Sequence, residues 1–526
     1  MKKFNIIKYL IIISVFTTSC EKNFLDVIPE DRLTDATFWQ TEKDVDLALA
    51  ACYRNWDNYR NILWLDLATD NGYSQFPNDR AQVIGNGQLN AANPGLFLWD
   101  FSQIRKYNNF LEKVEAVPMD EDKKKRYMAE VRFLRAYDYV RKVQLYGDVP
   151  LLTKVISDPA EAKLPRNPKG EVVNFILTEL AEIAPMLPVM NMRTSGGHAT
   201  QGAAYALKAR LELYEEMYPE AMLDAKKVMD MSVYELYPNY LEQFSVDNEN
   251  LNKESIMEIV QIRDFYATDV WVRLLPASVG GYSSITPVQN MVDAYEMADG
   301  KTINEASSGY NPDKPFENRD PRLGMTILYP GAMFNGKYFD PLSPTSPDYH
   351  QNAAGPRPGY NMRKYAKIVP SSLLMNSDVN IIAIRLAEVL LTYAEAAIEA
   401  NQITDEVYNA IDKVRQRAGM PKVNREEYNS QAKMRELIRR ERRVELAFEG
   451  LRYYDIKRWD IGNEVMNGPL YGSRLGSVNA QTGNVTWAAD RIKLEDRMFN
   501  AARNYLLPIP QTELDANPNI KQNPGY

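Results

Sequence analysis

Apolar residues recur at helical spacing over long stretches of this chain, and this spacing restricts the fold to one built mainly from α-helices. Residues 41–56 place an apolar stripe behind Thr41 and Asp44, which are spaced as a helix-capping box. The other predicted helices come mostly in pairs joined by short turns, at residues 122–146, 170–187, 203–215 with 219–230, and 380–400 with 404–418. Helix pairs in series are typical of a tetratricopeptide-like scaffold, so we expect a mainly α fold of helical hairpins.

Long irregular stretches lie between the helical segments. The longer one, residues 236–375, is rich in Pro, Gly, Asn and Tyr and contains the run PLSPTSPDYHQNAAGPRPGY. Loops of this length inside a compact domain usually carry function or are disordered. We therefore expect a single domain at residues 20–526, in which a helical scaffold, mainly residues 41–235 and 376–460, carries a loop-rich insert at about 236–375.

The N-terminus has the pattern of a secretion signal. Three lysines precede a short apolar run and the sequence FTTSC, which ends at Cys20. The run is too short to cross a bilayer as a helix, so residues 1–19 are predicted to be a cleaved signal peptide. Cleavage before Cys20 would leave its thiol at the new N-terminus, where bacterial lipoproteins carry their lipid. We predict lipidation at Cys20; the alternative is an ordinary signal peptide in which Cys20 is incidental.

Charge and composition exclude several other functions. The formal net charge of the chain is −8, whereas binding to nucleic acid requires clustered surplus Lys and Arg, so no nucleic-acid partner is expected. The two cysteines, Cys20 and Cys52, provide no disulfide framework, and His198 and His350 stand far apart in the sequence. We therefore predict no metal site and no cofactor.

The sequence contains no recognisable catalytic motif. The nucleophile elbow GxSxG, the zinc motif HExxH and the phosphate loop GxxxxGK[ST] are all missing from it. The run GNGQLN has only two of the three glycines of a dinucleotide turn. We predict that the protein is not an enzyme. A glycoside hydrolase remains an unlikely alternative, because 70 acidic residues could supply a carboxylate pair.

The segment RRERRVELAFEGLRYYDIKRW, residues 439–459, combines arginines, glutamates and aromatic residues. It could be a nucleic-acid surface or a buried structural brace. Glu436 precedes Arg440 by four residues, so a local ion pair is expected. Arg439 and Arg443 have no acidic residue at that spacing and should reach carboxylates on adjacent helices. We therefore interpret the segment as a structural brace.

Several segments, spread in order over nearly the whole chain after Cys20, resemble the SusD/RagB family. They are CEKNFLDVIPEDRLTDATFWQTEKDVDLALAACY, VRFLRAYDYVRKVQLYGDVPLL, VQNMVDAYEMADGK, RLAEVLLTYAEAAIEAN, the brace segment itself, and YLLPIPQTELDANPNIKQNPGY. Each segment alone is weakly specific, and the set together is highly specific.

This resemblance implies a mainly α, tetratricopeptide-like scaffold that carries a large irregular, ligand-binding half. It also implies a lipoprotein on the outer face of the outer membrane of Bacteroidetes-type bacteria. Such proteins cover a SusC-type TonB-dependent transporter as a lid and deliver captured nutrients to it, most often oligosaccharides. Some members of the family resemble peptide-capturing lids of the RagB type, so a peptide remains the alternative ligand.

Sugar rings present apolar C–H faces and a rim of hydroxyls, so a capture site needs flat aromatic rings beside polar side chains. Two segments in the regions of the family's binding loops supply both. The candidates are Asn71, Tyr73, Phe76, Asn78 and Arg80 in the first segment, and Tyr266, Trp271, Tyr282, Phe334, Tyr338 and Tyr349 in the second. Trp271 and Tyr73 are the leading candidates, followed by Tyr282 and Arg80. For every ring, the alternative is that it anchors its loop to the core.

Overall fold

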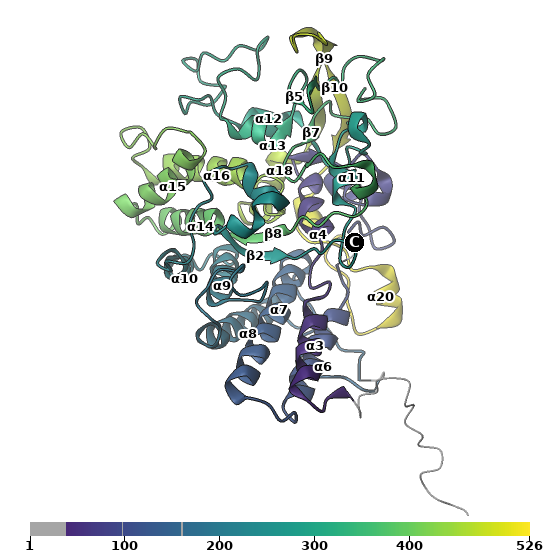
Figure 1. The fold of residues 1–526 in the computed structure, drawn as a ribbon, viewed down its shortest axis with the longest axis vertical. Helices are drawn as coiled ribbons and strands as arrows, with labels where there is room; N and C mark the ends of the chain where they lie inside the picture. Colours follow the sequence, from purple (N-terminus) through teal and green to yellow (C-terminus); the bar gives the residue numbers. More distant parts are fainter. Residues whose placement is uncertain (1–37, 97, 159–160) are drawn as a thin grey trace, which may run out of the picture.

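The computed structural model describes residues 38–96, 98–158 and 161–526 of the chain. The predicted signal peptide and Cys20 lie outside these residues. Among the helices that are described, none combines the length and the apolar composition needed to cross a bilayer. Figure 1 shows a helical part, drawn in purple to green, below and beside a part in which loops and short elements predominate.

The first half of the helical part is a series of antiparallel neighbours, which confirms the mainly α prediction. Each long helix packs on the one that follows it in this series, and α3 packs on α6 and α7. The capping box at Thr41 is present, because Thr41 Oγ1 accepts from Asp44 N and the Asp44 carboxylate accepts from Thr41 N. The helices are α3 (Glu42–Tyr53), α6 (Ser102–Val114), α7 (Glu121–Tyr146), α8 (Lys169–Ile183), α9 (Gln201–Tyr214) and α10 (Tyr218–Met229).

The second half continues the same stack, because α14 packs on α10 although more than 150 residues separate them. Its main helices are α14 (Leu386–Glu399), α15 (Asp405–Arg417), α16 (Gln431–Glu445) and α17 (Arg452–Arg458). The predicted helix at 380–400 is partly wrong, since its first residues form strand β8 (Ile381–Arg385). Both faces of β8 are buried, and a short apolar run of this kind is compatible with either structure.

Strand β8 pairs antiparallel with β2 (Ser255–Ile259) and so closes the base of the loop-rich region. Between these two strands the chain forms only short elements. They are α11 (Val270–Leu274), α12 (Gln289–Ala294), α13 (Arg322–Thr326) and the two-residue strands β3 (Thr286–Pro287), β4 (Ile327–Leu328), β5 (Met333–Phe334), β6 (Lys337–Tyr338) and β7 (Asn361–Met362). The long loops are therefore supported at both ends by one pair of strands.

A long β-hairpin near the C-terminus was not predicted. It consists of β9 (Gly468–Val478) and β10 (Val485–Arg497) and stands at the loop-rich end of the molecule (Figure 1). Most residues of β10 are exposed or half-buried on both faces. The alternation of apolar and polar residues that identifies a strand in a sequence is consequently weak here.

The segment 439–459, called the brace from here on, is buried, which confirms the structural interpretation. Its carboxylates Glu441, Glu445 and Glu449 accept from cations that come from other parts of the chain. These cations are Arg322, Lys364, Arg385, Arg415 and Arg417. The side chains of all five are at most 4% exposed, and those of Arg322 and Lys364 are fully buried.

Both brace arginines have long-range carboxylate partners, as predicted, but the partner of Arg443 lies in a turn and not on an adjacent helix. Arg443 Nη2 lies 2.8 Å from Asp70 Oδ2, and Arg439 Nη2 lies 3.9 Å from Glu399 Oε1 in α14. The expected local pair with Glu436 is wrong, because Arg440 Nε instead donates to Glu296 Oε1 at 2.6 Å. The brace thus ties the helical stack to the loop-rich part.

Candidate functional site

The two ring-bearing segments that the sequence singled out meet in space. Strand β1 (Gly72–Tyr73) pairs antiparallel with β3, and Thr286 Oγ1 donates to the Tyr73 carbonyl at 2.7 Å. Gln75 extends the contact, since its Nε2 donates to the Tyr282 carbonyl at 3.2 Å and its Oε1 accepts from Arg357 N at 2.8 Å. Loops from three distant parts of the chain are therefore joined at this point.

Tyr73 lines a cavity of about 430 Å³ at this junction, which we call the Tyr73 cleft. The other lining residues are His350, Gln351, Arg357, Ile492, Lys493 and Leu494, the last three from β10. Gln351, Arg357 and Lys493 are exposed, whereas Tyr73 is half-buried and its hydroxyl accepts from Gln82 Nε2 at 3.1 Å. The cleft thus combines a fixed aromatic ring with exposed amide, guanidinium and ammonium groups.

His350 contributes a neutral group to this cleft. Burial, and secondarily the charge of Arg357, lowers the pKa of His350 below its usual value of 6.5. Its Nε2 is buried without a hydrogen-bond partner among the described residues, and its ring meets that of Tyr349 edge to face at 4.8 Å. The imidazole is therefore an uncharged, largely buried wall of the cleft at pH 7.

Tyr282 is the most exposed of the predicted rings. It is 46% exposed, and its backbone lies at the same junction, because its carbonyl accepts from Gln75. The Arg273 guanidinium lies 6.0 Å from the centroid of its ring. Arg80 is also exposed and occupies a left-handed backbone position at φ 63°. Phe76 is half-buried. The structure therefore leaves Tyr282 and Arg80 accessible, and their role in binding a ligand stays a prediction.

The leading candidate, Trp271, is a core residue, so its prediction as an exposed platform is wrong. Its indole is 0% exposed and belongs to the main hydrophobic core. The reason lies in its neighbours, because Val270, Val272 and Leu274 of α11 are buried as well. A short apolar run inside a polar region folds inward for the same reason as any other apolar segment.

Asn71 is likewise not available to a ligand. It is 0% exposed, its Nδ2 donates to Asp66 Oδ1 at 2.9 Å, and its Oδ1 accepts from Arg443 Nε at 2.9 Å. Its role is to hold the turn that precedes Tyr73. The prediction of Asn71 as a ligand-binding residue is therefore corrected to a structural one.

The remaining predicted rings lie outside the lining of the Tyr73 cleft. Phe334 and Tyr338 are half-buried on the β5–β6 hairpin, where Phe334 packs on the core and Tyr338 packs on the apolar side chains of β9 and β10. Both rings behave as loop anchors, which was the alternative for each ring. Tyr349 is half-buried beside His350 and so lies next to the cleft.

Sequence reasoning missed several residues of the cleft, namely His350, Gln351, Arg357 and Lys493, as well as Gln75, which joins the loops beside it. His350 was considered only as a metal ligand, although it lies in the Pro- and Gly-rich run that was recognised as functional. Gln75 stood between two candidates, and its polar side chain could have been included. Nothing in the sequence connects Lys493 to Tyr73, because the β10 strand itself was not predicted.

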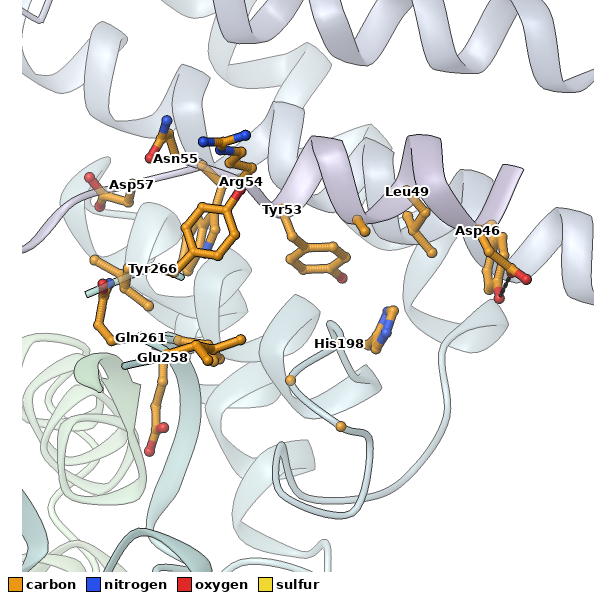
Figure 2. A pocket seen from close by; sticks show the side chains of 18 of the residues that line it. Asp46, Leu49, Tyr53, Arg54, Asn55, Asp57, His198, Glu258, Gln261 and Tyr266 are labelled. Atoms are coloured by element: carbon orange, nitrogen blue, oxygen red, sulfur yellow. Dashed lines mark hydrogen bonds between the residues drawn. The ribbon is translucent and has the colours of Figure 1, made fainter. Parts of the chain in front are cut away.

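The described residues hold a larger cavity elsewhere, with a volume of about 590 Å³, between α3, the start of α7 and the chain after β2 (Figure 2). Of the ring-bearing residues that the sequence singled out, Tyr266 lines it. No group of three or more His, Cys, Asp or Glu among the described residues could hold a metal ion.

Comparison with known proteins gives a consistent result. Residues 243–526 match the family model described as SusD family, and residues 23–213 match a model described as starch-binding associating with outer membrane. SusD-like protein P38 of Formosa agariphila is 28% identical and covers 90% of this chain and 95% of its own. The starch-binding protein SusD of Bacteroides thetaiotaomicron is 34% identical over 164 residues, which are 30% of this chain and 28% of that protein.

Solved structures are similar over almost the whole chain. A SusD-like carbohydrate binding protein of Bacteroides fragilis has a TM-score of 0.83 at 30% identity, covering 92% of this chain and 100% of that one. A laminarin binding SusD-like protein has a TM-score of 0.68 at 23% identity, covering 93% and 100%. At this identity the second likeness concerns the fold alone.

Proposed function

The chain belongs to the SusD family, and from this premise we propose that it captures oligosaccharides at the cell surface and delivers them to a SusC-type TonB-dependent transporter. In this proposal the protein is an outer-membrane lipoprotein held by the lipid on Cys20. It acts by binding and release, without chemical change of the ligand. A solved relative of 30% identity is a carbohydrate binding protein by its title, which supports the choice of ligand.

The observation that carries the proposal is the composition of the Tyr73 cleft. Tyr73, and Tyr282 beside the cleft, offer aromatic faces to the apolar side of a sugar ring. Gln351 and Arg357 supply exposed groups for sugar hydroxyls, which must regain the hydrogen bonds they lose with water. Binding sites of this kind combine aromatic walls with a few placed polar groups.

The size of the interaction suits a protein that must release its ligand. If each aromatic platform contributes about 0.5–1.5 kcal/mol, as aromatic pairs do beyond area burial, a few platforms give only a few kcal/mol. A binding free energy of about −4 kcal/mol corresponds to a dissociation constant of roughly 1 mM. Affinity in this range allows transfer to a transporter.

The ligand class is tested with the purified protein on a panel of immobilised polysaccharides, with a library of short peptides measured in parallel. We expect binding to at least one polysaccharide and a loss of that binding in the Tyr73→Ala/Tyr282→Ala variant. Exposed Leu223, which is 65% exposed on α10, provides the matched control Leu223→Ala. Binding of peptides with no binding of any polysaccharide would replace this proposal by a peptide-capturing lid.

The anchor and the partner need separate measurements. Cys20→Ala should leave the protein out of the outer-membrane fraction, whereas Cys52→Ala should not, because Cys52 is buried in α3. An affinity-tagged protein should co-purify with a TonB-dependent transporter from detergent-solubilised outer membranes. Membrane retention of the Cys20→Ala protein would contradict the lipid anchor.

A further inference from the structure

The cavity of about 590 Å³ between α3 and the chain after β2 shares no lining residue with the Tyr73 cleft. We call it the α3–β2 cavity. Its walls come from α3 and the turn after it, the first turns of α7, the glycine-containing loop that ends at His198, and the chain from Glu258 to Tyr266. Its volume of about 590 Å³ lies within the range of about 300–1,000 Å³ that small-molecule sites occupy.

Aromatic rings border this cavity, and hydrogen bonds hold the rings of Tyr53 and His198 in place. Figure 2 shows the rings of Tyr53, Tyr266 and His198 around one space. Tyr53 OH donates to Glu130 Oε2 at 2.9 Å and accepts from Ala199 N at 2.7 Å. The Tyr53 ring also meets the His198 ring edge to face at 5.2 Å. These contacts leave the Tyr53 ring preorganised as a wall.

The polar groups of the cavity divide into two kinds. The acidic ones are already bound: Asp46 Oδ1 accepts from Tyr127 OH at 2.7 Å, and Glu258 Oε2 lies 2.5 Å from Arg193 Nη2. By contrast, the side chains of Arg54, Asn55 and Gln261 have no hydrogen-bond or ion-pair partner among the described residues. The Arg54 guanidinium lies over the Tyr266 ring, 4.8 Å from its centroid.

His198 adds a further uncommitted group. Its Nδ1 is bound to Glu130 Oε2 at 2.6 Å, which leaves Nε2 for another partner. The cavity therefore offers two amides, one guanidinium and one imidazole nitrogen beside fixed aromatic faces. A ligand with many hydroxyls and apolar C–H faces matches this combination, whereas a ligand with a positive charge finds no free carboxylate.

The rim of the cavity carries apolar side chains that face solvent. A turn from Ile262 to Tyr266 is closed by a hydrogen bond from Tyr266 N to the Ile262 carbonyl at 2.6 Å. Within it, Phe265 is 82% exposed and Ile262 is 50% exposed. An aromatic ring this exposed, next in the chain to the Tyr266 wall, could receive the sugar unit that follows one held inside.

We propose that the α3–β2 cavity is a second saccharide-binding site, in which Tyr53 and Tyr266 hold a sugar ring and Arg54, Asn55 and Gln261 bind its hydroxyls. The proposal rests on the proposed function for the class of ligand, but it uses a different set of residues. Two sites on one body would let a long polysaccharide engage at two places, which raises its apparent affinity above that of a short oligosaccharide.

The test is isothermal titration calorimetry with neutral hexasaccharides: maltohexaose, laminarihexaose, cellohexaose, xylohexaose and mannohexaose. For the one that binds best, wild-type protein should bind two molecules. The variants Arg54→Ala/Tyr266→Ala and Tyr73→Ala/Tyr282→Ala should each bind one. Asn55→Gly is a milder variant, because the φ of 57° at Asn55 suits glycine, and it should weaken the cavity site about three- to tenfold.

Hydrogen exchange gives an independent reading. Amides of residues 196–199 and 260–267 should be protected by the same hexasaccharide in the Tyr73→Ala/Tyr282→Ala protein, and not in Arg54→Ala/Tyr266→Ala. The inference is overturned if the Arg54→Ala/Tyr266→Ala protein still binds two molecules or if no hexasaccharide binds. It is also overturned if the wild-type protein has one site and that site is lost in the Tyr73→Ala/Tyr282→Ala protein. A single site lost only with Arg54 and Tyr266 would support the cavity and contradict the Tyr73 cleft instead.

Discussion

Asp70 and Arg452 form a buried two-point ion pair across 382 positions of the sequence: Arg452 Nε donates to Asp70 Oδ1 at 2.8 Å and Nη2 to Oδ2 at 2.9 Å. Asp70 lies in the turn that leads to Tyr73, and Arg452 belongs to the brace. Arg497 of β10 holds the same turn, because its Nη2 donates to the Gly72 carbonyl at 2.9 Å. The turn that carries Tyr73 is thus held by buried residues that lie outside the lining of the Tyr73 cleft.

Removal of one member of this pair should lower the free energy of unfolding. Arg452→Ala leaves Asp70, which is 1% exposed, with a weaker set of partners, and loss of one partner of a buried ion pair typically costs about 3–5 kcal/mol. Urea unfolding should show a decrease in the free energy of unfolding of this order. In the control Arg425→Ala, which breaks an exposed pair with Asp405, the change should stay below about 1 kcal/mol.

The same pair predicts an acid-sensitive stability. Burial raises the pKa of Asp70, but the charges of Arg443 and Arg452 outweigh it and bring the pKa to about 2, from 3.8. Because the folded-state pKa is depressed, the stabilisation is present above pH 4 and is lost as the pH falls toward 2. Its size is about 2 kcal/mol.

The measurement is urea unfolding of wild type and Asp70→Asn between pH 6 and pH 2. The difference in free energy of unfolding between the two proteins should shrink by about 2 kcal/mol over this range. A difference that is constant from pH 6 to pH 2 would show that Asp70 does not titrate with a depressed pKa.

Replacement of the accessible rings should weaken binding without unfolding the protein. Tyr73→Ala and Tyr282→Ala should each lower the affinity of the Tyr73 cleft by roughly 2- to 12-fold, which corresponds to about 0.5–1.5 kcal/mol per platform. Titration calorimetry with the polysaccharide identified on the panel measures this. Unchanged affinity in both variants would place the ligand elsewhere.

Trp271→Ala should lower the stability of the protein and leave its affinity for oligosaccharide unchanged. Truncation of a fully buried indole costs about 3–5 kcal/mol of stability through the cavity it creates. At a temperature where the variant remains folded, its oligosaccharide affinity should equal that of wild type. A selective loss of binding with unchanged thermal stability would contradict the core position of this ring.

Binding in the cleft should be insensitive to pH near neutrality. Because the pKa of His350 is lowered below 6.5 by burial and by Arg357, its ring stays neutral throughout the range from pH 7 to pH 8.5. Affinity should be constant over that range and change only below pH 6.5. The titration is repeated with His198→Gln, which removes the other histidine of the chain. An inflection above pH 6.5 in both proteins would contradict a buried neutral imidazole.

The helical part of this fold could be predicted from the sequence because its signals are local. The apolar stripe of residues 41–56 and the Thr41 capping box depend on residues a few positions apart. The β9–β10 hairpin escaped prediction because most residues of β10 are exposed or half-buried on both faces, and β8 was mistaken for helix because both of its faces are buried. The buried role of the brace followed from its mixed charges, although its partner Asp70 could not be identified.

The sequence located the segments of the candidate site better than the orientation of their side chains. Aromatic and polar composition located two loops that do meet, but composition cannot distinguish a ring that points outward from one that points inward. Trp271 is buried because of Val270 and Val272, and Tyr282 is exposed because it follows a tight turn at Gly280 and Gly281. Lys493 reaches the cleft through pairing of β10, a contact that no local pattern reports.

The most direct test of the account is a crystal structure of the protein with a bound oligosaccharide from the polysaccharide that binds on the panel. The account predicts a sugar ring against Tyr73 or Tyr282, with its hydroxyls within hydrogen-bond distance of Gln351 or Arg357. A bound sugar that touches neither ring would contradict the assignment of the Tyr73 cleft as the site of capture.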